Sequence, residues 1–257
     1  MDDPCPGFRW ISGGATDQGM RRAVNQDAFL DRPDLGLWAV ADGMGGHRDG
    51  GRASRLLVEA LAALPHPRLL GAAGDAVRAA LTAVNRALFD ESAAADSDVI
   101  GSTIVTLIAV GDHCGILWVG DSRVYRLRDG VIARLTRDHT QVQALVDQGL
   151  LAPEQAEGHP YSNVLARAIG ADDWVEIDTR IEPLRDGDRY LLCSDGLDKE
   201  LGDPEIAVLL GGTNGGSDVG RIAQALVQRA CEAGGRDNVT AVVIRFERIL
   251  IPYKTVE

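Results

Sequence analysis

An apolar run that ends in an aspartate and several glycines constrains this chain more than any other feature. Residues 35–47 read Leu-Gly-Leu-Trp-Ala-Val-Ala-Asp-Gly-Met-Gly-Gly-His, so a strand-like segment leads directly into Asp42. The glycines that follow allow a sharp turn and a close approach of the backbone to another group. A carboxylate at the end of a buried strand is costly unless a cation or a hydrogen-bond donor compensates its charge. We therefore interpret Asp42 as a metal ligand.

Similar apolar segments adjoin four further aspartates, which are Asp27, Asp121, Asp195 and Asp237. Five carboxylates at strand ends, without a cluster of histidines or cysteines, form an oxygen-rich set that suits Mg²⁺ or Mn²⁺ rather than Zn²⁺. The alternative is that Asp-Gly pairs are ordinary turns. We expect that alternative at Asp129 and Asp186, where the neighbouring residues are polar.

Composition limits the class of protein and its partners. A chain of 257 residues, 45% of them hydrophobic, can form one sizeable core, so we expect a single domain over residues 1–257. The net charge of −12 argues against nucleic acid or an anionic membrane as the main partner. The four cysteines are widely spaced, which favours buried thiols over disulfides or a zinc site. With no signal-like start and no membrane-length apolar stretch, we expect a soluble cytoplasmic protein.

Apolar residues recur at helical spacing in three segments, which are residues 53–64, 75–88 and 219–230. Asp75 is the predicted N-cap of the second helix. Residues 139–170 contain prolines and many polar side chains, and we expect an irregular, partly helical flap there, beside a site.

Strand patterns occupy most of the remaining chain. We expect an edge strand at 8–12, strands at 174–181, 189–194 and 239–247, and a meander formed by 102–110, 114–119, 123–128 and 131–135. Asp129-Gly130 predicts a type I′ hairpin turn within that meander. Because pairs of helices interrupt groups of strands, an α+β fold with antiparallel sheets is favoured over a doubly wound parallel sheet.

Seven motifs in order give the chain a family resemblance, and they lie at residues 16–27, 40–47, 101–103, 119–125, 138–139, 192–197 and 235–240. Among them are Val-Ala-Asp-Gly-Met-Gly-Gly-His, Val-Gly-Asp-Ser-Arg-Val-Tyr and Gly-Arg-Asp-Asn-Val-Thr. Together they resemble bacterial metal-dependent type 2C (PPM-class) serine/threonine protein phosphatases. The resemblance implies a four-layer α-β-β-α sandwich, in which helix pairs flank two antiparallel sheets.

The resemblance also implies a role for each candidate site residue. Two Mn²⁺ or Mg²⁺ ions would be held by Asp42, the Gly43 carbonyl, Asp195 and Asp237. Asp27 would hold metal-bound waters, Asp121 would help to bind a third ion, Arg22 would grip the substrate phosphate, and Asn238 would orient waters or ligands.

The implied reaction is the hydrolysis of phosphoserine and phosphothreonine on proteins, by direct attack of a metal-bridging hydroxide. The implied protein is a monomer that opposes a bacterial Ser/Thr kinase. Met44 stands where eukaryotic members carry a histidine, so both His47 and a metal-bound water are open as the acid for the leaving group. Gln26 replaces a glutamate of many relatives and removes one outer carboxylate.

One alternative belongs to another functional class, namely a non-catalytic phosphopeptide-binding or regulatory module that kept the scaffold. The intact carboxylate set disfavours it, because buried acids are costly to retain without a use. A cysteine-dependent phosphatase is excluded, since no cysteine is followed six positions later by arginine.

Overall fold

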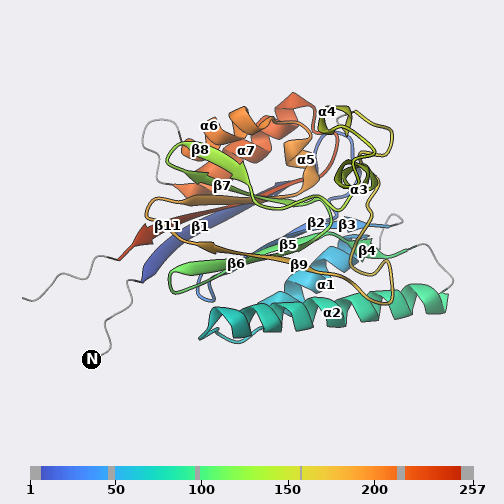
Figure 1. Ribbon diagram of the computed structural model, residues 1–257, viewed down its shortest axis with the longest axis horizontal. Helices are drawn as coiled ribbons and strands as arrows, with labels where there is room; N and C mark the ends of the chain where they lie inside the picture. Colours follow the sequence, from blue (N-terminus) through green and yellow to red (C-terminus); the bar gives the residue numbers. More distant parts are fainter. Residues whose placement is uncertain (1–6, 46–49, 96–98, 157, 213–217, 250–257) are drawn as a thin grey trace, which may run out of the picture.

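Two antiparallel β-sheets pack face to face in the computed structural model, which describes residues 7–45, 50–95, 99–156, 158–212 and 218–249 (Figure 1). The first sheet has the order β1 (Phe8–Asp17), β11 (Val239–Arg248), β10 (Arg189–Cys193), β7 (Arg123–Arg128) and β8 (Val131–Arg134). The second has the order β2 (Asp27–Arg32), β3 (Leu37–Met44), β5 (Ile104–Val110), β6 (His113–Val119) and β9 (Asp178–Pro183), and β4 (Gly101–Ser102) pairs with β3.

Helices cover the outer face of each sheet (Figure 1). The second sheet carries α1 (Gly50–Ala62) and α2 (Leu70–Ala95), and the first carries α6 (Asp203–Gly211) and α7 (Val219–Ala233). The buried face of α7 includes Val219, Ile222 and Leu226, as its helical spacing predicts. The predicted α+β sandwich is confirmed.

The space between the sheets is filled by large aromatic side chains. Trp38 of β3, Tyr190 of β10 and Phe246 of β11 are fully buried. Their rings meet edge to face, with centroids 6.1 Å apart for Trp38 and Phe246 and 5.5 Å apart for Tyr190 and Phe246. This contact joins the two sheets whose strand ends carry the candidate site residues.

The predicted meander is wrong as a single sheet. β5 pairs with β6 in the second sheet, whereas β7 pairs with β8 in the first. The chain crosses between the sheets at residues 120–122, where Gly120 has a φ of 105°. Asp121 therefore lies in the connection from one sheet to the other, and not in a hairpin turn between two strands of one sheet.

Other local predictions have mixed outcomes. Asp129 and Gly130 have φ values of 53° and 77°, which confirms the type I′ turn. The N-cap at Asp75 is wrong, because α2 begins five residues earlier at Leu70. Cys114 and Cys193 are free and buried, as expected. No helix in the described part of the chain combines the length and the apolarity that a bilayer crossing requires.

Residues 139–170 contain two short helices, α3 (Gln141–Asp147) and α4 (Pro153–Ala156), at one end of the sandwich (Figure 1). Thr140 caps α3, since its side chain accepts a hydrogen bond from the Gln143 N–H. Isolated bridges from Thr140 to Leu165 and from Ser102 to Ile169 tie the segment to itself and to β4. The segment is therefore irregular but anchored at both ends.

Candidate metal centre

Each sheet contributes two of the predicted acids. Asp27 and Asp42 lie directly opposite each other on the paired strands β2 and β3. Asp195 follows β10 and opens the short helix α5 (Asp195–Asp198), and Asp237 lies just before β11. Because β10 and β11 are antiparallel neighbours, the end of one strand and the start of the other lie at the same edge of the sheet.

Two glycines allow the backbone to close in around these acids. A Cβ on Gly196 would lie 2.0 Å from the Asn238 carbonyl oxygen and 3.3 Å from the Asp237 Cβ. A Cβ on Gly43 would lie 2.0 Å from the Gly50 carbonyl oxygen. These distances are too short for any side chain, so both positions require glycine. The glycines after Asp42 and Asp195 thus allow neighbouring backbone segments to approach closely, in addition to allowing a turn.

The carboxylates lie within one another's electric fields. Burial, together with the charges of Asp195 and Asp237, raises the pKa of Asp27 to about 7, against the hydrogen bonds from Thr240 and Ser194 that lower it. Burial raises the pKa of Asp42 well above its usual range, with added repulsion from Asp27 and Asp195. Acids that are distant in sequence therefore converge; Asp195 is buried there, and Asp27, Asp42 and Asp237 are partly buried.

Two carboxylate oxygens at this centre are buried without a hydrogen-bond partner. Asp27 accepts from the Ser194 hydroxyl at 2.7 Å and from the Thr240 hydroxyl at 2.6 Å, and both bonds go to Oδ2. Its Oδ1 has no partner, and neither has Oδ1 of Asp195. An ionised carboxylate can only accept, so a divalent cation is the natural partner for such atoms. The residues fit a centre for Mg²⁺ or Mn²⁺.

Two of the acids are bound to side-chain cations. Arg22 Nη2 lies 2.7 Å from Asp237 Oδ2, and the Lys199 ammonium pairs with Asp195 Oδ2. Across the described ranges, no three His, Cys, Asp or Glu side chains form a preformed metal cage. Two of the carboxylates are instead paired with cations of the chain itself. Metal binding would have to displace or accommodate both cations.

Asn238 holds the loop that carries Arg22 against β11. Its Oδ1 accepts from the Gln26 N–H at 2.9 Å, and its Nδ2 donates to the carbonyls of Gln18 at 2.9 Å and Val24 at 3.1 Å. These bonds position the segment before Asp27. Asn238 therefore has a structural role that its sequence motif did not indicate.

Asp121 lies at the crossing between β6 and β7 and is buried. Burial raises its pKa to about 7; the charge of Asp195 adds to the shift, and the charge of Lys199 opposes it. Asp121 thus lies within the electric field of Asp195. His47, considered as an acid for the leaving group, lies outside the described residues.

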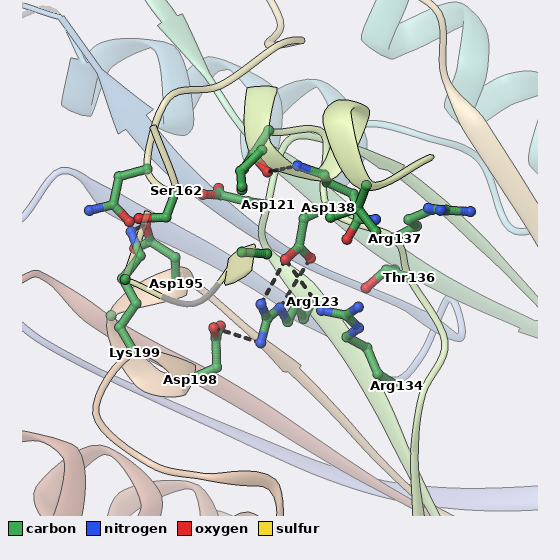
Figure 2. Close-up of a pocket in the computed structure, with 18 of the residues that line it drawn as sticks. Asp121, Arg123, Arg134, Thr136, Arg137, Asp138, Ser162, Asp195, Asp198 and Lys199 are labelled. Atoms are coloured by element: carbon green, nitrogen blue, oxygen red, sulfur yellow. Dashed lines mark hydrogen bonds and ion pairs between the residues drawn. The ribbon is translucent and has the colours of Figure 1, made fainter. Parts of the chain in front are cut away.

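A pocket of about 1030 Å³ leads from these acids to the segment predicted as a flap (Figure 2). Asp121, Asp195 and Asp237 line it, and residues of α3 and α4 contribute to its wall. In its wall, Arg123 bonds to Asp138 at 2.7 Å and to Asp198 at 2.7 Å (Figure 2). This ion-pair network and Lys199 were not predicted from the sequence. The spacing of Asp195 and Lys199, four residues apart, was the available signal.

Comparison with known proteins places this site in a family. The model of the protein phosphatase 2C family matches residues 19–233. The chain is 39% identical over 232 residues to the serine/threonine protein phosphatase PstP of Mycobacterium tuberculosis, covering 89% of this chain and 43% of PstP. It is 35% identical to the serine/threonine phosphatase stp of Listeria monocytogenes, covering 89% of this chain and 93% of that protein.

Solved structures agree in fold. PppA of Pseudomonas aeruginosa, a key regulatory component of its T6SS, superposes with a TM-score of 0.85 at 39% identity, covering 93% of this chain and 98% of that one. The catalytic domain of PstP in complex with two manganese ions has a TM-score of 0.80 at 36% identity, covering 93% and 99%. Since the family model, the curated relatives and the fold agree with the carboxylate centre, this chain belongs to the protein phosphatase 2C family of bacterial PPM-class serine/threonine phosphatases.

Proposed function

We propose that this protein hydrolyses phosphoserine and phosphothreonine on proteins, depends on two Mn²⁺ or Mg²⁺ ions, and opposes a bacterial Ser/Thr kinase. The observation that carries the proposal is the pair of buried, unpartnered oxygens on Asp27 and Asp195, of which Asp195 lines an open pocket. Support comes from relatives that are serine/threonine phosphatases and from PstP with its two manganese ions.

Asp42, Asp195, Asp237 and the Gly43 carbonyl would hold the ions, and Asp27 would hold the waters around them. When bound, two divalent ions supply an activated water for in-line attack on phosphorus and neutralise the charge of the phosphate oxygens. In a protein of net charge −12, these ions and Arg22 would provide the local positive charge that an anionic substrate needs.

The test of this proposal is metal-dependent release of phosphate from a phosphothreonine peptide and from para-nitrophenyl phosphate. Release with Mn²⁺ and none with EDTA is the expected result. Tight binding of the peptide without release at any metal concentration would instead identify a phosphopeptide-binding module. A catalytically dead variant separates true turnover from contamination, and Asp42→Asn serves that purpose.

Arg22 is the residue we expect to bind the phosphate. Its side chain is 54% exposed, and the hydrogen bond to Asp237, with the charges of Asp237 and Asp42, raises its pKa. Arg22→Ala should raise KM for a phosphopeptide by about 10- to 100-fold, since a charge-assisted hydrogen bond is lost, with a smaller change in kcat. Arg22→Lys should recover only part of the affinity, because an ammonium has no planar fork for two oxygens. An unchanged KM in Arg22→Ala would contradict this role.

A further inference from the structure

The feature that the proposed function leaves unexplained is Lys199. It directly follows α5 and lies four residues after Asp195, a spacing that brings two side chains together on one helical face. Its ammonium donates to Asp195 Oδ2, and 32% of the side chain is exposed. A lysine of the chain thus contacts an acid that is also expected to bind metal.

Asp121 belongs to the same charge cluster. The charge of Lys199 lowers the pKa of Asp121 against the effect of burial, and the charges of Asp195 and Asp121 raise the pKa of Lys199. Figure 2 shows Lys199, Asp195 and Asp121 in the same part of the pocket. The ammonium therefore compensates the charge of Asp195 through a direct contact and also acts on Asp121, the acid that the family resemblance assigns to a third ion.

Neighbouring basic residues have other partners and do not share this role. Arg123 pairs with Asp138 and Asp198. Arg236 lines the same pocket but pairs with Glu200 at 2.9 Å. Lys199 is therefore distinguished from them by its contact with Asp195.

We propose that the Lys199 ammonium takes the place of a third divalent ion between Asp121 and Asp195, so that this protein binds two ions at the centre and not three. A divalent ion shared by these two acids would meet the ammonium at close range, in surroundings where like charges are poorly screened. Lysine suits the position, because its compact charge on a flexible stem can reach an acid one helical turn away. The inference rests on the proposed metal centre.

The experiment counts ions bound to the metal-free protein, by calorimetric titration with MnCl₂ and by electron paramagnetic resonance of the free Mn²⁺. Wild type should bind two ions. Lys199→Met, which keeps the length of the side chain and removes its charge, should bind a third ion, with an affinity at least roughly tenfold above any residual binding of a third ion by wild type. Lys199→Gln should behave as Lys199→Met does, and Lys199→Arg should keep the count at two.

Arg236→Met is the matched control, since it removes one positive charge from the same pocket without touching Asp195. Its ion count should equal that of wild type. Equal uptake of a third ion by wild type and by both neutral variants of Lys199 would overturn the inference alone, and so would a count of two in both neutral variants. If no variant bound Mn²⁺, the metal centre itself would be refuted, and the inference with it.

Discussion

Asp42→Asn should lower the turnover of a phosphothreonine peptide by roughly 10³-fold or more, because it replaces an ionised oxygen with an amide at the centre of charge stabilisation. Asp42 is the acid on which the charges of Asp27, Asp195, Asp121 and Asp237 all act. A residue in that position would hold both ions, so its loss cannot be offset by any single neighbour. The measurement is kcat/KM with Mn²⁺, at saturating metal.

The fold should survive this substitution. Asparagine has nearly the volume of aspartate, and the Asp42 backbone bonds to Thr103 do not involve the carboxylate. Removing a buried charge also removes its repulsion with Asp27 and Asp195. Without metal at neutral pH, the variant should therefore have a Tm at least as high as that of wild type, while losing most of the stabilisation that Mn²⁺ gives.

Asp129→Asn is the matched control for Asp42→Asn. Asp129 also precedes a glycine, but it is exposed in the β7–β8 hairpin, and asparagine tolerates its φ of 53°. Activity and the response to Mn²⁺ should be those of wild type. Normal turnover in Asp42→Asn, with Mn²⁺ still raising its Tm, would refute the assignment of Asp42.

The sequence predicts the position of the acids well because each local pattern encodes two facts at once. An apolar run ending in Asp-Gly specifies both a buried strand and a carboxylate at its end, as at Asp42 and Asp195. The pattern does not predict which strands pair with each other. The segments at 104–119 and 123–134 look alike locally, yet they belong to different sheets, since the crossing at Gly120 depends on contacts made only in the folded chain.

Two other outcomes depend on tertiary structure in the same way. Gly71 and Gly74 are poor helix formers, but α2 begins before them because residues such as Ala73 pack into the core. The pairing of Asp195 with Lys199 requires the turn of α5, which the sequence presented as part of an Asp-Gly turn. The family resemblance predicts the acids of the site, but it does not predict that Lys199 pairs with Asp195.

The pH dependence of stability offers a separate test, and its sign follows from the raised pKa values. Asp27 and Asp121 titrate near 3.8 when unfolded and at about 7 when folded. Below pH 3.8 each group is protonated in both the folded and the unfolded protein, so it does not change the free energy of unfolding. As the pH rises from 3.8 toward 7, these two acids are ionised in the unfolded chain but still protonated in the folded protein. The free energy of unfolding therefore falls with pH, and it stops falling above the folded pKa.

Raising the pH from about 5.5 to about 8 should therefore destabilise the metal-free protein, by on the order of a few kcal/mol. The buried His139 has a lowered pKa and would give the opposite slope, so a fall in Tm is specific to the raised acids. Mn²⁺ should reverse the trend, because it binds the ionised carboxylates and releases their protons. The measurement is Tm against pH in EDTA and in Mn²⁺, and Asp27→Asn should flatten the EDTA curve. A metal-free Tm that rises across this range would show that the acids do not converge as described.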